Sequence, residues 1–262
     1  MGLNQLDFEN QTKIEGAIAL LQVYEPPEGY YLAFSGGKDS VVIYDLAVKS
    51  GVKFDAHYCV SPIDPPQIWK FIKENYPEVI WDYHARGFWK TVAHKGLPMR
   101  NRRWCCELIK EAGGDGRTCV IGIRHAESSK RKSRRCFETS RDGKKQFLSP
   151  IIKWSDNEVW DYIHINNLSY CELYDKGFKR VGCVLCPYNS NLELQLKCCP
   201  EIVKLWLKAC DRLVERNKKQ GWINKRGKPI KHKFETGQEL FNWWTARNVK
   251  QSKLDDYEGM LL

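Results

Sequence analysis

Long hydrophobic runs are missing from this sequence of 262 residues, so no segment predicts a membrane-spanning helix. The first ten residues, MGLNQLDFEN, contain neither a basic segment nor an apolar one, which argues against a secretory signal peptide. The sixth position is neither serine nor threonine, so the start Met1-Gly2 does not fit an N-myristoylation signal. Internal repeats and low-complexity tracts are also missing. We therefore expect a cytoplasmic protein with an ordinary folded core.

Cysteine, by contrast, is abundant, with 11 residues in the chain. The cytosol keeps thiols reduced, and the number of cysteines is odd, so a disulfide framework is not expected. Cysteines in such a protein more often bind metal or take part in chemistry.

Positive charge is in excess, with 42 Lys and Arg against 32 Asp and Glu and a formal net charge of +10. This excess favours a polyanionic partner such as nucleic acid, or a substrate that carries phosphate or sulfate. A solvated basic surface is the alternative, and charge alone does not separate the two.

Segments of strand and helix character alternate along the first part of the chain, which predicts an α/β fold with a doubly wound, mostly parallel sheet. The segment 128–145 is polar and basic and is predicted to be a loop, while Ser155 and Glu158 form a capping box that begins a helix. The expected strands are 30–34, 54–60, 79–83, 119–123 and 147–152, and the expected helices include 6–23, 41–48, 88–94, 104–111 and 200–216.

A glycine-rich loop stands between the first expected strand and the helix that follows it. A loop in that place directs the free N–H groups of the helix N-terminus at a bound anion, and glycines allow close backbone approach. Serine hydroxyls can donate to phosphate oxygens, the lysine adds positive charge, and the aspartate is expected to organise the turn or a magnesium ion. An ordinary Gly-Gly turn is the alternative. The candidate nucleotide-binding residues are Ser35, Gly36, Gly37, Lys38, Asp39 and Ser40.

This loop is not a Walker motif, which needs four residues between its first glycine and the Gly-Lys pair. The sequence SGGKDS resembles the PP-loop of ATP pyrophosphatases. That resemblance implies an adenine nucleotide α-hydrolase-like fold and cleavage of ATP between its α and β phosphates.

Four cysteines form two pairs, Cys105-Cys106 and the CxxC pair Cys183 and Cys186. Four thiolates can hold a tetrahedral zinc ion or an iron–sulfur cluster. Adjacent cysteines converge less easily on one small ion, which favours a [4Fe–4S] cube over Zn²⁺. Buried small hydrophobic residues are the alternative.

A CC pair followed by a CxxC pair resembles the cluster signature of adenylyl-sulfate reductases, in the phosphoadenosine phosphosulfate (PAPS) reductase family of the PP-loop superfamily. The segments 122–128 and 174–180 also resemble motifs of that family, and the similarity spans about residues 30–188. The resemblance implies that Arg124 faces the nucleotide and that Lys110 lies near the cluster and the substrate. Arg100 and Arg103 are expected to contact phosphate or sulfate, or to be simple surface charge.

The sequence departs from this family at its end. Sulfonucleotide reductases attack sulfur with a cysteine near the C-terminus, whereas no cysteine follows Cys210 here. The pair Cys198-Cys199 is more consistent with packing than with a redox role. The departure puts the reductase activity in doubt but leaves the nucleotide and cluster sites unaffected.

Two domains are predicted: residues 1–190, a PP-loop nucleotide-binding α/β domain that includes the cysteine site, and residues 191–262, a basic helical C-terminal extension. The first functional hypothesis is an ATP pyrophosphatase that uses Mg²⁺ and a [4Fe–4S] cluster and activates an acceptor for sulfur transfer. The acceptor can be nucleic acid, bound by the basic segments 130–135 and 218–233. A sulfur donor protein and self-association are further possible partners. The predicted catalytic residues are Lys38, Asp39, Lys110 and Arg124.

Two alternatives remain open at this stage. The chain can be a PAPS or adenylyl-sulfate reductase with a displaced cysteine, or a nucleotide-binding regulatory or nucleic-acid-binding module without turnover.

Overall fold

The computed structural model describes residues 3–189, 191–223 and 227–258. It divides the chain into two compact units, each made of segments that are separate in the sequence. The sheet unit comprises Met1–Val60, Pro66–His84 and Glu111–Gly182, and the helical unit comprises Ser61–Pro65, Ala85–Lys110 and Cys183–Leu262. The two units are described here separately.

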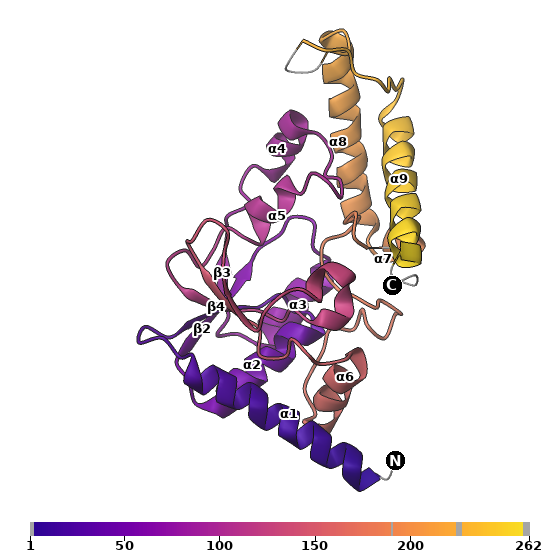
Figure 1. Cartoon of the computed structure of the whole chain (residues 1–262). Coiled ribbons are helices and arrows are strands. Elements are labelled where there is room, and N and C mark those ends of the chain that lie inside the picture. The colour runs from indigo at the N-terminus through magenta and orange to yellow at the C-terminus, as the bar shows by residue number, and fades with distance from the viewer. Residues whose placement is uncertain (1–2, 190, 224–226, 259–262) are drawn as a thin grey trace. The chain divides into compact units, whose positions relative to one another are not determined.

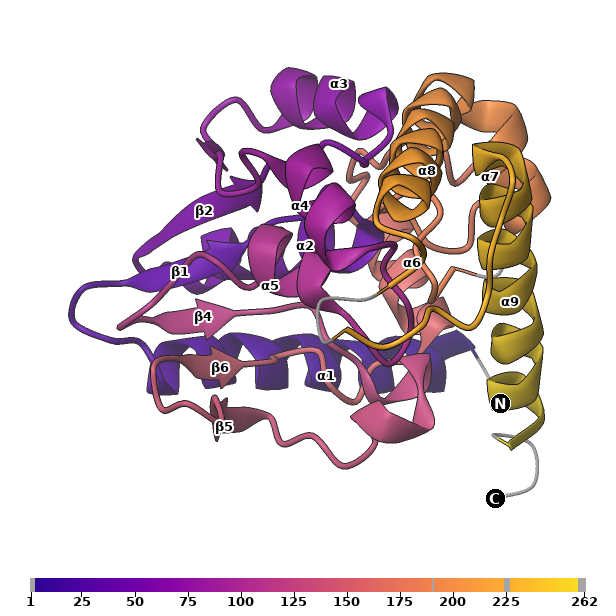
Figure 2. The same cartoon turned by 90° about the horizontal axis from the view of Figure 1, so that it is seen from above.

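The sheet unit contains six strands in the order β3-β2-β1-β4-β6-β5. All neighbouring strands are parallel except β5, which runs antiparallel to β6, as Figure 2 shows. This confirms the predicted mostly parallel α/β fold. The strands are β1 (Tyr30–Ala33), β2 (Phe54–Cys59), β3 (Ile80–Asp82), β4 (Thr118–Val120), β5 (Phe137–Thr139) and β6 (Gln146–Leu148).

The strand order reverses between β1 and β4, because the chain proceeds from β1 to β2 and β3 on one side and returns through β4 on the other. In open α/β sheets a ligand binds beyond the carboxyl ends of the strands at such a switch point. The two segments that leave these ends are the glycine-rich loop after β1 and the segment 121–124 after β4.

The helices of the sheet unit include α1 and α2, which lie side by side, and α6, which packs against α2 (Figure 1). The predicted capping box of α6 is present, because the Ser155 side chain accepts from the Glu158 backbone and the Glu158 carboxylate accepts from the Ser155 backbone. The bounds are α1 (Leu3–Val23), α2 (Lys38–Ser50), α3 (Pro66–Asn75), α6 (Asp156–Ile165) and the 3₁₀ turns η1 (His125–Glu127) and η2 (Ser129–Arg131).

The segment 128–145 differs from the predicted loop, because it contains η2 and the short strand β5. The Phe137 ring of β5 stacks on Tyr24 with ring centroids 4.5 Å apart. Pairing with β6 and this aromatic contact order a segment whose composition alone reads as a loop.

The helical unit is built around an aromatic core. The indole of Trp206 is fully buried, and its ring packs against Phe88, Trp89 and Trp244. The Trp244 indole N–H donates to the Pro98 carbonyl over 2.7 Å. The helices are α4 (Phe88–Lys95), α5 (Trp104–Ile109), α7 (Leu192–Cys198), α8 (Pro200–Lys219) and α9 (Gly237–Glu258), of which α8 and α9 lie side by side (Figure 1).

Within the described residues, no helix combines the length and the apolar character that crossing a membrane requires.

Candidate functional site

The glycine-rich loop connects β1 to α2 and depends on Gly36. This residue has a φ of +69°, and a Cβ at this position would lie 3.0 Å from Ile68 and 3.2 Å from Ile72. Both the left-handed backbone and the close approach of α3 therefore require glycine.

The hydroxyl groups of the loop hold its shape. The Ser40 hydroxyl donates to the Gly37 carbonyl over 2.7 Å, and the Ser35 hydroxyl donates to the Ser40 hydroxyl over 3.3 Å. The Lys38 backbone N–H donates to the Tyr174 hydroxyl over 2.9 Å. The loop is thus formed by its own residues and by a tyrosine far away in the sequence.

Lys38, the first residue of α2, is 4% exposed. Its ammonium group lies 2.9 Å from the Asp156 carboxylate, whose side chain is 60% exposed. The ammonium also lies 5.9 Å from the ring centroid of Trp160 and 5.8 Å from that of Tyr174. Because Asp156 is well solvated, its ion pair with Lys38 is weak, and a bound phosphate can compete with it.

Arg124 is 2% exposed and donates through all three of its nitrogens. Nε donates to Asp39 over 2.6 Å, Nη2 donates to Asp156 over 2.8 Å, and Nη1 donates to a backbone carbonyl at residue 154 over 3.3 Å. A Cβ on Gly122 would lie 3.0 Å from the Asp39 Cβ, so glycine allows this approach. The Arg124 side chain links the two carboxylates nearest the loop, and its contact with a nucleotide stays a prediction.

The two carboxylates differ in their protonation behaviour. Burial raises the pKa of Asp39, and the charges of Arg124 and Lys38 offset that rise only in part. Burial acts to raise the pKa of Asp156 too, but the hydrogen bonds and charges of Lys38 and Arg124 outweigh it and leave the pKa lowered. Asp156 is therefore the more acidic of the two carboxyl groups beside the loop.

Positive charge accumulates next to this network. Arg131, the last residue of η2, forms an ion pair with Glu127. Burial lowers the pKa of Arg131, and the nearby charge of Arg180 lowers it further. Counting Lys38 and Arg124, four cations face three carboxylates here. The excess positive charge favours an anionic ligand.

Five residues of this network were not predicted as site residues: Glu127, Arg131, Asp156, Tyr174 and Arg180. Asp156 follows the capping serine and was recognised only as part of a helix start. Tyr174 belongs to the segment 174–180 that resembles a family motif, and Arg131 belongs to the basic segment. The sequence contained a local pattern at each of these residues, but it did not show which residues pair with one another in the folded chain.

The four paired cysteines all belong to the helical unit. Cys105 and Cys106 lie on α5, and the Cys186 backbone N–H donates to the Cys183 carbonyl over 3.3 Å in a tight turn. The pKa of Cys105 is raised by its hydrogen bond to Cys106, by burial, and by the proximity of Cys183 and Cys186. The prediction that the two pairs come together is consistent with this arrangement.

Two basic residues flank these thiols. A hydrogen bond to Cys105 lowers the pKa of Cys106 against the effect of burial, and Arg103 and Lys110 lower it further. The Arg103 guanidinium donates to Cys106 Sγ over 3.4 Å. Lys110 therefore lies near the thiols, as the resemblance implied.

The spacing of the sulfurs bears on the kind of group they can hold. Four thiolates on one tetrahedral zinc ion would lie about 3.8 Å apart. In the parts of the chain that the structure describes, no three of these four sulfurs lie within 4.8 Å of one another. Four such thiols can hold a cluster of several iron atoms, or a zinc ion if they move closer together.

Arg100 and Arg103 also contact the segment that follows the CxxC pair. Arg100 Nε donates to the Pro187 carbonyl over 2.8 Å, and both guanidinium groups lie 5.0 Å from the ring centroid of Tyr188. The Tyr188 hydroxyl in turn donates to the Arg100 carbonyl over 2.8 Å. These arginines therefore tie the two cysteine segments together within the helical unit.

Comparison with known families identifies the chain. The phosphoadenosine phosphosulfate reductase domain matches residues 29–189, which is more than half of the sequence. The chain belongs to the PAPS reductase family. The match includes the glycine-rich loop, Arg124 and all four paired cysteines.

Curated relatives fall into more than one kind. An uncharacterised protein of Methanocaldococcus jannaschii is 33% identical over 77% of this chain and 46% of its own length. An adenosine 5'-phosphosulfate reductase of Staphylococcus epidermidis is 26% identical over 72% of this chain and 84% of its own length. A probable FAD synthase of Schizosaccharomyces pombe is 29% identical over 60% of this chain and 59% of its own length.

The chain spans about half the length of the first M. jannaschii relatives. Among solved structures, PAPS reductase from Candida auris matches 70% of this chain and 96% of its own, with a TM-score of 0.50 and 19% identity. At that identity the likeness supports the fold alone.

Proposed function

We propose that this PAPS reductase family member is an ATP pyrophosphatase that activates an acceptor for sulfur transfer. The observation that carries the proposal is the preformed anion site at the start of α2. Lys38 is buried there against a solvated carboxylate, in a group of four cations and three carboxylates. The β and γ phosphates of ATP, with Mg²⁺, suit such a site.

The relatives support an adenine nucleotide as the ligand. Adenosine 5'-phosphosulfate and FAD both contain an adenosine 5'-phosphate group, and relatives named for each align with this chain. The common element is the adenylyl group rather than one reaction. ATP cleaved between its α and β phosphates supplies the same group to an acceptor.

The thiols of the sheet unit favour this reaction over attack by a cysteine on the sulfur of a sulfonucleotide. Burial raises the pKa of each of these four thiols, so none of the four is activated as a thiolate at neutral pH. These thiols are Cys59, Cys119, Cys136 and Cys171.

The proposed roles follow the contacts. Lys38 and the loop from Ser35 to Ser40 hold the leaving pyrophosphate, and the N–H groups of α2 stabilise its charge. Asp39 and Arg124 are proposed as positioning residues, because each engages the other rather than open solvent. Lys110 is proposed to act beside the thiols, where its charge favours an anionic group.

Cys105, Cys106, Cys183 and Cys186 are proposed to hold a [4Fe–4S] cluster, with Zn²⁺ as the alternative. Such a cluster, when bound, supplies a site at which sulfur can be held. Arg103 and Lys110 then balance the negative charge of the thiolates.

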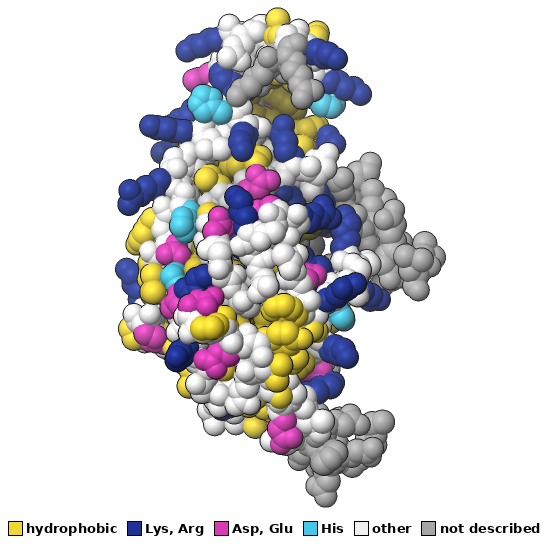
Figure 3. All heavy atoms as spheres, turned by 60° about the vertical axis from the view of Figure 1, so that its left-hand side comes forward, with side chains coloured by type: hydrophobic (Ala, Val, Ile, Leu, Met, Phe, Trp, Pro, Cys, Tyr) yellow, Lys and Arg dark blue, Asp and Glu magenta, His cyan; other side chains and the backbone are white. Residues whose placement is uncertain are grey.

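Exposed basic side chains support a nucleic-acid acceptor. In the helical unit they gather around the end of α8 and the connection that follows it, at the top of Figure 3. They are Lys218, Lys219, Lys228, Lys231 and Lys233, while 224–226 lie outside the described residues. In the segment 130–135, only Lys130, Lys132, Ser133 and Arg135 are exposed.

The test uses ATP labelled in its α phosphate, Mg²⁺, anaerobically purified protein, and single-stranded or transfer RNA or DNA as acceptor. We expect AMP or adenylylated acceptor together with pyrophosphate, and Lys38→Met should lower the rate at least about 100-fold. Lys49→Met is the matched control, because Lys49 is also on α2 and paired with an aspartate.

Two results would count against the proposal. Release of ADP and orthophosphate would show cleavage at the wrong bond. Absence of pyrophosphate with every acceptor, despite ATP binding, would favour a nucleotide-binding module without turnover.

A sulfonucleotide reductase is the second candidate, favoured by the alignment with 84% of the S. epidermidis reductase. It would release sulfite from adenylyl sulfate or PAPS in the presence of thioredoxin. Sulfite release that one Cys→Ser variant outside the four paired cysteines abolishes would establish this function in place of the first.

A further inference from the structure

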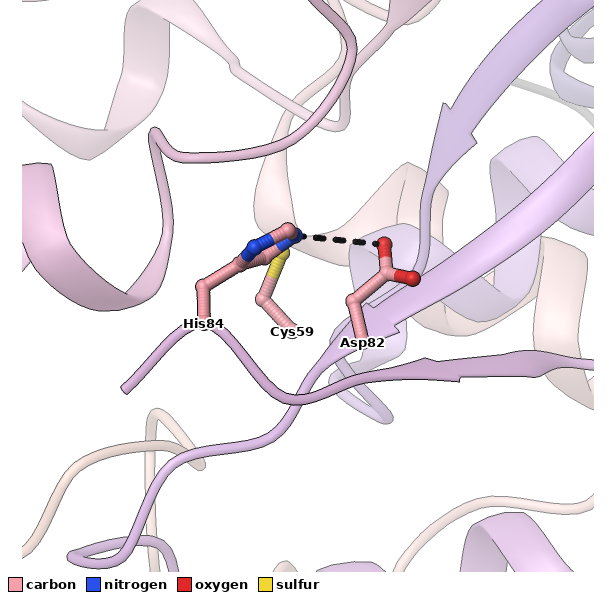
Figure 4. A group of neighbouring side chains, drawn as sticks. All are labelled: Cys59, Asp82 and His84. Carbon is pink, nitrogen blue, oxygen red and sulfur yellow. Dashed lines mark ion pairs between the residues drawn. The ribbon is translucent and has the colours of Figure 1, made fainter. Parts of the chain in front are cut away.

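A second group of potential metal ligands lies at one edge of the sheet unit, apart from the four paired cysteines. Cys59 is the last residue of β2 and is paired in register with Asp82, the last residue of β3. Neighbouring residues in register project to the same face of a sheet, so the thiol and the carboxylate lie together. His84, two residues beyond β3, turns its ring toward both, as Figure 4 shows.

The distances are close to those between the ligands of a single ion. The sulfur of Cys59, a carboxylate oxygen of Asp82 and a ring nitrogen of His84 all lie within 4.8 Å of one another. His84 Nε2 lies 3.7 Å from Asp82 Oδ2. With zinc bonds of about 2.3 Å to sulfur and about 2.0 Å to nitrogen or oxygen, tetrahedral ligands lie roughly 3.2–3.7 Å apart. Small side-chain rotations would bring all three to that spacing.

Other side chains fix the orientation of these ligands. The Tyr31 hydroxyl donates to Asp82 Oδ2 over 3.1 Å and lies 3.7 Å from Cys59 Sγ. His57 Nδ1 lies 2.9 Å from the same Asp82 oxygen, and the Tyr31 and His57 rings stack with centroids 4.2 Å apart. Metal ligands characteristically have hydrogen-bonding partners that hold them in this way.

We propose that Cys59, Asp82 and His84 form a binding site for a divalent transition metal of the zinc type. One thiolate, one imidazole and one carboxylate suit Zn²⁺ better than Mg²⁺ or Ca²⁺, which prefer oxygen ligands. Their two negative charges neutralise the ion. Three protein ligands leave a fourth position open, as in zinc sites that bind water or a substrate. The site does not depend on the proposed reaction with ATP.

The test is metal binding by the full chain, with Co²⁺ as a spectroscopic substitute for Zn²⁺. A Cys105→Ser/Cys106→Ser/Cys183→Ser/Cys186→Ser background keeps the four paired cysteines out of the measurement. In that background we expect about one ion per chain, with the visible bands of tetrahedral Co²⁺ and a sulfur-to-cobalt charge-transfer band.

Four variants sharpen the assignment. His84→Gln, at an exposed position, should weaken binding by more than about 100-fold without unfolding the chain. Cys59→Ser should remove the charge-transfer band. His84→Cys should keep the ion and strengthen that band, because a second thiolate replaces the imidazole. Tyr31→Phe should weaken binding by about 10- to 100-fold through loss of ligand orientation.

Matched controls are Cys136→Ser and His164→Gln, which remove the same donor types elsewhere in the sheet unit. Thermal unfolding with and without Zn²⁺ gives a second readout, since an ion that binds the folded chain raises Tm. No bound Co²⁺ in the background protein, or identical spectra for His84→Gln and the controls, would overturn the proposal.

Discussion

The two units of the molecule differ in the groups that surround their buried ionisable side chains. In the sheet unit, Lys38 and Arg124 are buried, but each is paired with a carboxylate. In the helical unit, the four paired thiols lie near one another, and Arg103, Lys110, Ser61 and Asp64 lie beside them. Buried cations that are paired need no ligand to be stable, whereas clustered thiols repel once they ionise.

The two units should therefore differ in how strongly the structure of their sites depends on a bound ligand. The nucleotide site should be formed before ATP binds, and ATP should change the stability of the sheet unit only by mass action. The thiols should depend on a bound cofactor, because cofactor binding energy at such sites is also folding energy.

The largest expected effect is loss of the cofactor from the helical unit. Cys183→Ser/Cys186→Ser should abolish iron and sulfide binding after anaerobic purification and remove the visible absorption of a cluster. The affinity of the sheet unit for ATP should change less than about threefold, since its charged network contains no cysteine.

Cys198→Ser is the control for that experiment, because Cys198 is also a half-buried cysteine of the helical unit. A colourless wild-type protein with bound zinc would refute the cluster assignment. A large loss of ATP affinity in the double variant would show that the two sites are coupled.

The second prediction tests whether the aromatic core, rather than the cofactor alone, supports the helical unit. Trp206→Ala removes a fully buried indole and should lower the free energy of unfolding by about 3–5 kcal/mol. Trp206→Phe should cost less, because the indole N–H has no hydrogen-bond partner among the described residues. Urea unfolding followed by tryptophan fluorescence measures both, and equal losses would contradict the packing argument.

The sequence allowed prediction of features that are contiguous along the chain. The strand, the loop and the helix that carry Lys38 occur in one stretch, and so does the capping box at Ser155. The parallel α/β fold followed from the alternation of strand and helix. Local patterns suffice here because each signal acts over a few residues.

Contacts across the fold were not predictable in the same way. Asp156 pairs with Lys38 although 118 positions separate them, and Tyr174 reaches the backbone of the same lysine. The contact of Arg124 with nucleotide stays a prediction, and its ion pairs with Asp39 and Asp156 had no signal in the sequence. Residue types in a motif indicate charge near a site but not which groups pair with one another.

The third prediction tests the close packing of the charged network in the sheet unit. Gly122→Ala adds a Cβ that would lie 3.0 Å from the Cβ and 3.1 Å from the carbonyl carbon of Asp39. We expect a loss of about 1–2 kcal/mol in stability and a roughly tenfold weaker affinity for ATP, because Asp39 must move. Gly16→Ala, on a helix with open space around it, should be neutral or slightly stabilising.

The smallest predicted effect concerns an ion pair of the sheet unit away from the nucleotide loop. The Arg117 guanidinium donates to Asp55 Oδ2 over 2.7 Å and to the Gly29 carbonyl over 3.0 Å. Burial acts to raise the pKa of Asp55, but hydrogen bonds from Arg117 and His57 outweigh it and lower the pKa. The pair therefore stabilises the folded state above the ordinary carboxyl pKa of about 3.9.

Arg117→Met should lower the free energy of unfolding by about 1 kcal/mol at pH 7, since the pair is partly solvated. Stability gained by a lowered pKa is lost as pH falls through that pKa, so the difference between wild type and variant should shrink below about pH 4. Thermal unfolding at pH 7 and pH 3 measures it, with the exposed Arg141→Met as control. A difference that stays constant with pH would mean that Arg117 acts through its contact with Gly29 rather than through Asp55.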